Sequence, residues 1–520
     1  MAGIAVAGAI TAMAASLPQS RTIDFPTINY ANTSVLEISN VVLTDTATIV
    51  NVNVQFTPHY WIKIQSGSQL KADGKNYALK GAEKIVPDSL FWMPDSGVAD
   101  FSLIFEPLPY STTEFDFVEG DSQEDWKLWN IDISGKEFQE YPDKVPTYLR
   151  KNAVDGPVPD PAFEIGTTTV RFHLLPYIDG YMDDAYLYVN SIDGAQKEMS
   201  VKFDKNGEGS LTFDQYGTVT AWLVDPIQRI SLGTYTFYPG ETVDCYVDMR
   251  LTGFASMRNN KINKKSGIPH NSIHNGKYKN YDRMQEKGNF EYPNSYYGLD
   301  LYTGDFADYH MSGAEYKAMV KRKYDNMSDS IASLDAPQMV KDIKKIRLQN
   351  EVLKAIGDYR YFLEHNYRSV HNAWREKELP LDSIPGVLTD KDFAEVATWF
   401  DIDNPKLAMY YDSGLSDGLD WNAHGVKGDL SKSLNMYRKY AHKAESMELT
   451  QDDLNELKKL SNPFFATACD SIYTRTKRSF EKLQSSVSYT PTPDVEDEEV
   501  FDAIIAPHKG KVVIVDLWNT

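Results

Sequence analysis

The chain has 520 residues, of which 42% are hydrophobic and 24% are charged, and its formal net charge at pH 7 is −21. This length exceeds what one hydrophobic core supports and predicts roughly three or four domains. The acidic balance excludes a nucleic-acid partner or an anionic membrane surface, because neutralising phosphates requires clustered Lys and Arg. The 32 tyrosines and 9 tryptophans fit carbohydrate or peptide contacts, but they are at least as typical of β-sheet cores.

Residues 1–20 indicate a signal-peptide-like segment. Residues 2–16 are small and apolar, and they include an Ala12-Met13-Ala14 triplet that resembles a cleavage site, although no basic n-region precedes them. An unusual apolar tail is the alternative. A signal peptide implies export to the periplasm or cell envelope. No stretch beyond this leader approaches the roughly 20 apolar residues that a membrane span requires.

Residues 30–150 predict a β-rich module. Between Val50 and Phe56 apolar and polar residues alternate, which is typical of a strand with one face buried. Asp73-Gly74 predicts a hairpin turn. Further strands around 103–105 and 115–118 would complete a small sandwich or an open sheet.

A segment rich in Pro and Gly, residues 152–161, predicts a linker and a domain boundary. Residues 162–255 predict a second β module, because residues 170–174 and 199–203 again alternate between apolar and polar side chains. We expect an antiparallel β-sandwich.

The turn at Asn206-Gly207 allows two interpretations. Asp204, Asn206 and Glu208 could begin a calcium loop, but the bidentate glutamate at the twelfth loop position is missing. A plain hairpin is therefore favoured.

Residues 256–310 predict a basic loop or linker, in which Lys and Arg gather between Arg258 and Lys287 among Asn, Gly and Ser. This island is also a candidate docking surface for an acidic partner. His270 and His274 have the spacing of a helical metal pair, but the neighbouring Pro269 argues against a helix, so no metal site is expected.

Residues 311–484 predict a mostly α-helical module. Ser312-Gly-Ala-Glu315 has the pattern of a capping box, and Pro337 predicts the start of the next helix. Further N-caps are expected at Thr389, Thr450 and Asn462. Residues 485–499 combine Ser, Thr and Pro with a closing acidic run, which predicts a flexible acidic tether.

The chain has two cysteines, Cys245 and Cys469. Alternating apolar residues around Cys245 indicate a strand residue that points into a core, and Cys469 lies in a helical pattern. A disulfide between them would fit an oxidising compartment, but nothing in the spacing predicts one. Two unrelated buried thiols are favoured.

The end of the chain carries its most informative pattern. Residues 512–515 are a run of apolar, mostly β-branched residues, typical of a strand that is buried on both faces of an α/β sheet. Asp516 ends this run.

This tract resembles the thioredoxin-like disulfide reductases of the TlpA type, whose signature reads approximately G-K-x-V-x-V-D-F-W-A-T-W-C-x-x-C. The positions in register are Gly510, Lys511, Val513, Val515, Asp516, Trp518 and Thr520. Leu517 and Asn519 depart mildly from the signature. Residues 500–506 also resemble the short helical segment that these proteins place before the strand.

The resemblance implies a Cys-x-x-Cys pair at the N-terminus of the following helix, where the helix dipole stabilises a thiolate that attacks a substrate disulfide. This chain has neither cysteine. We therefore expect residues 500–520 to be the incomplete start of a thioredoxin-like domain and the chain as given to be inactive. By the same resemblance, Asp516 is the candidate catalytic residue, an aspartate that exchanges a proton with the resolving thiol. A strand-end Asp bonded to nearby backbone is the alternative.

Together these patterns predict a multidomain α+β chain with antiparallel β-sandwich-like modules, a mostly α-helical module and the first strand of a truncated thioredoxin fold. The resemblance implies the N-terminal region of an exported protein disulfide reductase, whose accessory modules position or bind disulfide- or thiol-containing proteins. The alternative is a non-catalytic cell-envelope protein that recognises glycan or peptide through its β modules. No nucleotide loop, zinc framework or nucleophile elbow stands out, so no cofactor is expected.

Overall fold

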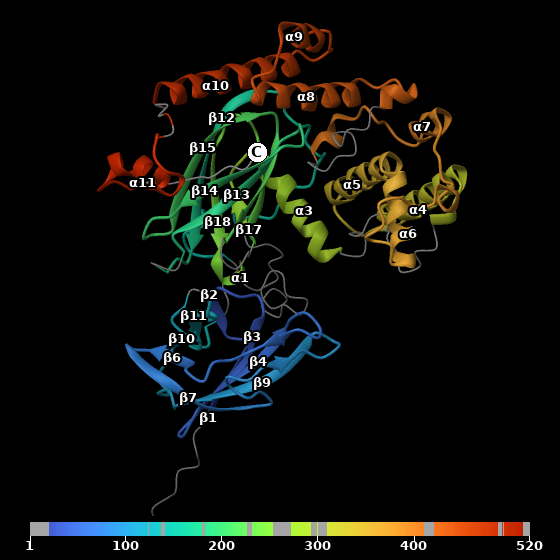
Figure 1. Cartoon of the computed structure of the whole chain (residues 1–520). Helices are drawn as coiled ribbons and strands as arrows, with labels where there is room; N and C mark the ends of the chain where they lie inside the picture. The colour runs from blue at the N-terminus through green and yellow to red at the C-terminus, as the bar shows by residue number, and fades with distance from the viewer. Residues whose placement is uncertain are drawn as a thin grey trace, which may run out of the picture.

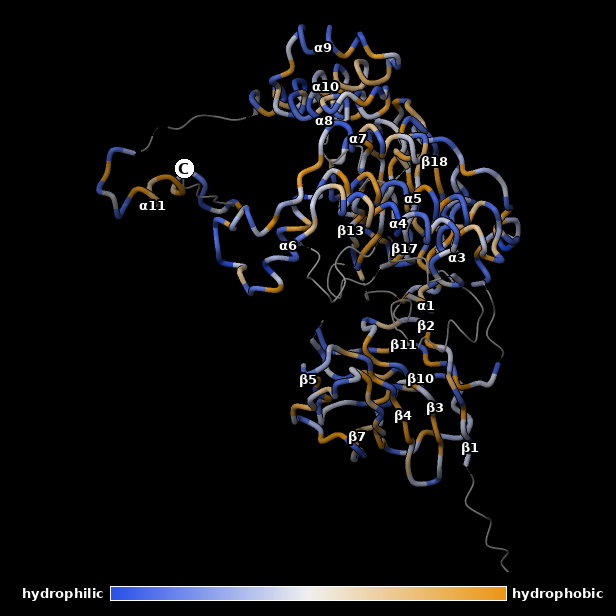
Figure 2. The backbone as a smooth tube through the Cα atoms, turned by 90° about the vertical axis from the view of Figure 1, so that its right-hand side faces the viewer, coloured by the Kyte–Doolittle hydropathy of each residue, from blue (hydrophilic) through white to orange (hydrophobic). Residues whose placement is uncertain are grey.

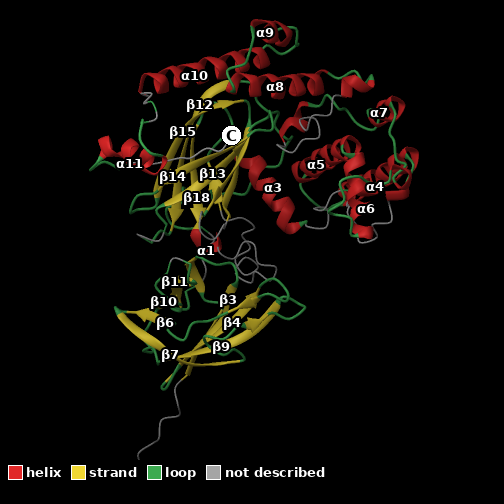
Figure 3. Ribbon diagram, in the orientation of Figure 1, coloured by secondary structure: helices red, strands yellow, loops and turns green. Residues whose placement is uncertain are grey.

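The computed structural model describes residues 20–122, 124–136, 141–178, 182–225, 231–252, 272–292, 299, 309–409, 421–486, 491 and 493–512. Over these residues the chain is multidomain α+β, as predicted, with two β modules and a helical region that lies against the second (Figure 1). Strands and helices are segregated along the chain and in space (Figure 3). The signal-peptide-like residues 1–19 and the candidate catalytic residue Asp516 lie outside the described residues.

The N-terminal module is built from short antiparallel strands and begins at Ser20, earlier than the expected residue 30. Nine of its strands form one sheet in the order β1-β3-β4-β9-β7-β6-β10-β11-β2, and β5 and β8 form a separate two-stranded ribbon. The strands are β1 (Ser20–Asp24), β2 (Thr27–Ala31), β3 (Leu36–Thr44), β4 (Thr48–Gln55), β5 (Trp61–Ile62), β6 (Gln69–Ala72), β7 (Lys75–Glu83), β8 (Phe91–Trp92), β9 (Val98–Phe105), β10 (Glu114–Val118) and β11 (Lys127–Asp132). The alternation between Val50 and Phe56 is confirmed as β4.

Strand β7 folds the nine-stranded sheet over itself. Its first residues pair with β6 and its last residues pair with β9, so the two halves enclose one hydrophobic core. The predicted hairpin at Asp73-Gly74 is confirmed between β6 and β7. Both residues have positive φ, 47° and 71°, as the tight mirror-image turn requires.

The second module is a sandwich of two four-stranded sheets, β15-β12-β18-β19 and β14-β13-β16-β17. Its strands are β12 (Ile165–Leu175), β13 (Asp184–Asn190), β14 (Gln196–Lys202), β15 (Glu208–Tyr216), β16 (Val219–Val224), β17 (Ser231–Phe237), β18 (Thr242–Asp248) and β19 (Ser272–His274). The pairs are antiparallel, as expected, except that β12 and β18 run parallel.

Asn206-Gly207 turns the chain as predicted, but the turn does not make a hairpin within one sheet. The N–H of Gly207 donates to the carbonyl oxygen of Asp204 at 2.9 Å. After a single bridge between Phe203 and Gly209, however, β14 stays in one sheet and β15 pairs with β12 in the other. Gly207 has φ +76°, a conformation that favours glycine. An added Cβ would also lie 2.6 Å from the side chain of Tyr177, so backbone conformation and space both require glycine here.

The expectation of a basic loop is wrong for residues 272–292. Ser272–His274 add strand β19 to the sandwich, and Lys279–Glu291 form helix α3, which packs against β17 and β19. Lys279 and Lys287 lie on the solvent-facing side of this helix, while Tyr281 and Met284 enter the core of the helical region. Residues 253–271, including His270, lie outside the described residues.

A four-residue helix, α1 (Met249–Thr252), joins the two β modules (Figure 1). Met249 belongs to the core of the sandwich, whereas Leu251, two residues later, belongs to the core of the N-terminal module. In the opposite direction, the ring of Tyr30 enters the sandwich core, and its hydroxyl donates to Asp225 at 3.2 Å. The two cores therefore exchange side chains.

The helical region follows the predicted caps. Its helices are α4 (Gly313–Ser333), α5 (Gln338–Gly357), α6 (Tyr359–His371), α7 (Asp390–Val396), α8 (Asp429–Glu445), α9 (Gln451–Leu457) and α10 (Phe464–Ser486). Capping boxes form at Ser312, Thr389 and Thr450, and the side chain of Asn462 accepts a hydrogen bond from the N–H of Phe464. Local capping chemistry thus fixed these helix starts correctly.

The Pro- and Gly-rich segment 152–161 is docked on the helical region. The carboxylate of Asp155 accepts hydrogen bonds from the N–H groups of Gln338 and Met339, at 2.9 and 2.8 Å, in the first turn of α5. Val158 is buried in the helical core. The N-cap of α5, Pro337, makes no side-chain cap bond, so the segment supplies the missing cap from outside the helix.

The described end of the chain stands apart from both modules. Helix α11 (Val500–Ile505) leads away from the body of the molecule in Figure 2 and leaves Phe501 and Ile504 exposed. Among the described residues, no helix combines the length and the apolar character needed to cross a bilayer.

Candidate functional site

Both cysteines are free and buried, which confirms the expectation of two unrelated thiols. Burial raises the pKa of the Cys245 thiol well above its usual value, and it raises that of Cys469 to about 12. A reactive cysteine needs a stabilised thiolate and access to its substrate. The described part of the chain therefore offers no thiol suited to disulfide exchange.

Cys245 nevertheless belongs to a buried cluster that the sequence did not suggest. Across the β18–β19 pair it faces His274, whose Nε2 lies 2.9 Å from Oδ2 of Asp282 on α3. The N–H of Gly276 donates to Nδ1 of His274 at 3.3 Å, which leaves the ring proton on the side of Asp282. Asp282 also accepts two hydrogen bonds from Thr236, at 2.7 and 2.6 Å.

This cluster contains the residue types of a thiol catalytic triad, but not its arrangement. Nδ1 of His274 accepts a hydrogen bond, Nε2 lies close to Asp282 without hydrogen-bond geometry, and Cys245 and His274 are closed off from solvent. A nucleophile and its base must be reachable by a substrate. The cluster is therefore a polar joint that fixes α3 to the sandwich.

The remaining candidate ligand groups have structural roles. The carboxylate of Asp204 accepts hydrogen bonds from the N–H groups of Glu208 and Asn206, and these bonds hold its pKa below the usual value. This supports the turn over the calcium loop. Across the described ranges, no group of three or more His, Cys, Asp or Glu residues is placed to hold a metal ion.

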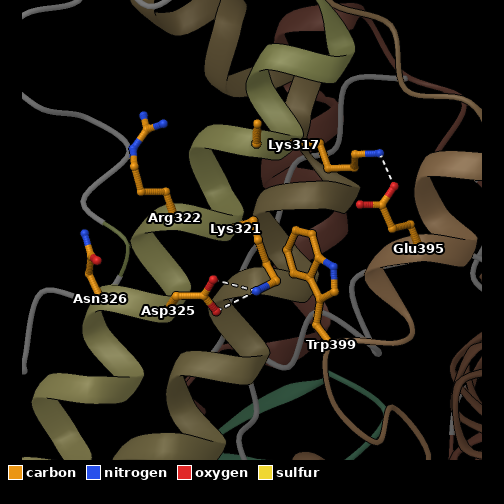
Figure 4. A pocket seen from close by; sticks show the side chains of 8 residues that line it. Lys317, Lys321, Arg322, Asp325, Asn326, Glu395 and Trp399 are labelled. Atoms are coloured by element: carbon orange, nitrogen blue, oxygen red, sulfur yellow. Dashed lines mark hydrogen bonds and ion pairs between the residues drawn. The ribbon is translucent and has the colours of Figure 1, made fainter.

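An open cleft of about 400 Å³ lies along α4, beside α7 (Figure 4). Two of its lysines form ion pairs with carboxylates. Lys317 contacts Asp392 and Glu395 at 2.7 and 2.5 Å, and Lys321 contacts Asp325 at 2.5 Å. The ammonium of Lys321 also lies 5.5 Å from the centre of the Trp399 ring.

The main effect of this arrangement is on Asp392. The hydrogen bond from Lys317 is the largest cause that lowers the pKa of Asp392 to about 2. Paired charges of this kind stabilise the α4–α7 contact. The same shift keeps Asp392 ionised at neutral pH, so this carboxyl group cannot serve as a general acid.

A smaller cavity, of about 150 Å³, lies between the sandwich and the helices α8 and α10. Two ion pairs cross this seam: Lys197 to Glu445 at 2.8 Å, and Arg475 to Asp214 at 3.6 Å. Buried Tyr437 lines the inner wall. Both ion pairs tie a strand to a helix, so this cavity belongs to the joint between the two parts.

A group of exposed apolar side chains lies on the N-terminal module. We call it the tryptophan ribbon, and it consists of strands β5 and β8 with their flanking residues. Its side chains are large, apolar and exposed: Tyr60 (62%), Trp61 (48%), Val86 (67%), Leu90 (51%) and Trp92 (61%). Exposed apolar side chains that gather into one patch are typical of interaction sites.

Strand pairing explains why the two indoles lie together. Trp61 and Trp92 are directly opposite each other in the β5–β8 pair, so their side chains share one face. The next pair, Ile62 and Phe91, points to the other face, where Ile62 is buried. The pairing of two strands so far apart in the chain was not visible in the sequence.

No protein-family model matches this chain, and no curated protein sequence matches it. The similarities to solved structures are distant and include three pullulanases. A pullulanase from Anoxybacillus sp. LM18-11 is 12% identical over 36% of this chain and 24% of that chain, with a TM-score of 0.15. The type I pullulanase from Bacillus subtilis, complexed with maltose, is 7% identical over 37% and 23%, with a TM-score of 0.16. The pullulanase from Bacillus acidopullulyticus is 10% identical over 41% and 35%, with a TM-score of 0.14.

At these TM-scores the similarities carry no argument about fold or activity. The chain spans about a quarter to a third of the length of each pullulanase.

Proposed function

We propose that residues 20–486 are the non-catalytic accessory region of an exported TlpA-like thiol-disulfide oxidoreductase, which positions or binds disulfide- or thiol-containing proteins. The observation that carries the proposal is the tract Gly510 to Thr520, whose residues fall in register with the TlpA signature. The buried state of both cysteines agrees with it, because the redox chemistry would then reside outside the described residues.

The chemistry of such a reductase gives each part of the protein a role. A thiolate at a helix N-terminus attacks the substrate disulfide, and a second thiol resolves the mixed disulfide. Asp516 would exchange a proton with that resolving thiol. The exposed segment around α11 would give the redox domain freedom to reach substrates held by the accessory region.

Two measurements test this proposal. The reading frame beyond the codon for Thr520 should encode a Cys-x-x-Cys pair within the first few residues, and a different sequence there overturns the proposal. The 520-residue chain itself should show no insulin reduction beside a thioredoxin control. Its two thiols should react with Ellman's reagent only after unfolding, and rapid reaction of either native thiol would show that the chemistry has been misplaced.

A second candidate is a non-catalytic cell-envelope protein that recognises glycan or peptide through its β modules. The tryptophan ribbon favours it, because five large apolar side chains remain exposed on one small strand pair and its loops. This candidate predicts saturable binding to a glycan or peptide panel even when the frame encodes no redox cysteines. Absence of binding to every member would exclude it.

A further inference from the structure

We propose that the tryptophan ribbon binds a neutral polysaccharide, with the apolar faces of its sugar rings stacked on Trp61 and Trp92. The proposal rests on the second candidate function, in which the β modules are binding modules, and it selects the class of ligand for one surface. It does not depend on the redox role of the chain.

The first support is that the side chains of Trp61 and Trp92 are both exposed. No ring contact joins Trp61 to Trp92 among the aromatic contacts of the described residues, although cross-strand pairing places the two side chains on one face. The neighbouring Tyr60 is also exposed, and its ring meets that of Phe56 edge-on at 6.5 Å. Flat aromatic faces with a polar edge suit a ligand that is apolar on one side and wet on the other.

The second support is that the ribbon is held in place by its backbone. The N–H of His59 donates to the carbonyl oxygen of Met93 at 3.1 Å, and the N–H of Met93 donates to that of Tyr60 at 2.8 Å. Buried Met93 and Ile62 anchor the inner side in the module core. Because the platform is fixed before binding, the ligand does not have to order it.

The preceding loop is fixed in the same way. The N–H of Asp88 donates to the carbonyl oxygen of Ile64 at 2.8 Å, and the Asp88 carboxylate accepts a hydrogen bond from the N–H of Ser66 at 3.0 Å. These bonds hold the loop that carries Val86 and Leu90 against residues 64–66. The exposed apolar surface is thus a built feature of the fold.

The third support is the charge balance of the ribbon and of the whole chain, which favours an uncharged ligand over a polyanion. The segments 59–66 and 84–95 contain two lysines, Lys63 and Lys84, and two aspartates, Asp88 and Asp95, so their formal charges cancel. The chain as a whole carries −21 and repels polyanions such as nucleic acid, acidic peptides and anionic lipid surfaces. A neutral polysaccharide meets no such repulsion.

Hydrogen-bonding groups stand at the edge of the platform for sugar hydroxyls. Nε2 of His59 lies 3.4 Å from Oδ1 of Asp95, and both side chains are highly exposed. An exposed pair of this kind contributes little to stability. Each side chain can therefore give up its contact with the other and hydrogen-bond a ligand hydroxyl at small cost. Stacking and edge hydrogen bonds would then act together.

The test uses the full chain in native gels that contain a neutral polysaccharide, with hydroxyethyl cellulose, dextran and laminarin as separate probes. Retardation by at least one probe is expected, and W61A or W92A should weaken the apparent affinity about tenfold each. The matched control is W374A, which removes another exposed tryptophan, from the helical region. It should migrate like the native chain.

Far-UV circular dichroism of each variant shows whether the fold is kept, and W61F and W92F should retain part of the affinity because they keep an aromatic face. No retardation by any neutral polysaccharide overturns the proposal, as does equal weakening by W374A. Tryptophan-dependent binding to phosphatidylcholine vesicles or to a peptide panel, without polysaccharide binding, also overturns it. A peptide result would still leave the second candidate function standing.

Discussion

The two β modules are built from the same alternating strands, but they differ in what lies against them. The sandwich is flanked by α3, α8 and α10, and its polar groups end in buried bonds such as those of Asp282 (Figure 1). The N-terminal module meets the sandwich through α1 and Tyr30, and its tryptophan ribbon stays exposed. Helices of the chain thus cover the sandwich, whereas the described residues leave the tryptophan ribbon of the N-terminal module exposed.

The strongest test of this contrast is Asp282→Ala. The change leaves the N–H and hydroxyl of Thr236 without their buried acceptor and removes the carboxylate beside Nε2 of His274, so the free energy of unfolding should fall by about 3 to 5 kcal/mol. Urea unfolding followed by circular dichroism measures it.

A matched control is Asp390→Ala. Asp390 also pairs with a histidine, His424, at 2.9 Å, but its side chain is largely exposed. We expect a loss below about 1 kcal/mol there. Equal losses in the two variants would contradict the description of the α3 joint as a buried network.

A smaller effect is expected from Asp155→Ala, which removes the cap of α5. The cost should be about 1 kcal/mol, the usual value of a lost helix cap. Asp160→Ala in the same segment is the control, because its exposed side chain makes only a 3.8 Å ion pair with Lys406.

The cap should also depend on pH in a defined direction. Its hydrogen bonds with Met339 and Gln338 lower the pKa of Asp155 from 3.8, so the stabilisation is present above pH 3.8 and is lost as pH falls through the folded-state value. The difference between native chain and variant should therefore shrink in acid. A difference that persists there would show that the cap acts without its charge.

The half-buried ion pair at the α4 cleft should give a smaller effect still. Lys317→Met removes the main cause of the low pKa of Asp392, so that pKa should rise from about 2 toward 3.8 in an NMR titration. Because the folded pKa is depressed, the stabilisation is full above pH 3.8 and fades toward pH 2. Stability at neutral pH should fall by less than about 1 kcal/mol.

The control for this pair is Lys321→Met, which breaks the contact with Asp325 instead. It should leave the titration of Asp392 in place. A shift of equal size in both variants would mean that the general field of the cleft, and not the Lys317 hydrogen bond, sets that pKa.

The smallest effect on folding is expected at the ribbon. Trp61→Ala and Trp92→Ala should change the free energy of unfolding by less than about 0.5 kcal/mol, as for other exposed positions. Trp421→Ala should cost about 3 to 5 kcal/mol, since Trp421 is fully buried in the helical region. A large loss at Trp92 would make the ribbon a structural element and remove the contrast between the modules.

Local signals predicted the local structure. The alternation that became β4, the turn at Asp73-Gly74 and the capping boxes at Ser312, Thr389 and Thr450 each depend on residues within a few positions of one another. Neighbouring side chains decide such features, and the sequence displays them directly.

Features that depend on distant residues were missed. Helix α3 looked like a loop because its start at Lys279 has no side-chain cap, and its stability comes from Tyr281 and Met284 in the helical core. The segment around Asp155 was predicted only as a linker, because its partner, the first turn of α5, follows much later in the chain. Propensity is a weak guide where tertiary contacts supply the free energy.

The candidate site likewise combines features that the sequence displays with features that only the fold creates. Tryptophan and tyrosine were recognised as suited to ligand contacts, but only the register of β5 with β8 places Trp61 and Trp92 side by side. The assignment to Asp516 stays a prediction, because that residue lies outside the described ranges.

Helix α1 has a mechanical consequence. Its Met249 is seated in one core and its Leu251 in the other, so a load that pulls the N-terminal module away from the sandwich must draw an apolar side chain into water. A ligand held at the ribbon would transmit its drag through this short element to the rest of the molecule. The junction therefore resists separation of the two β modules.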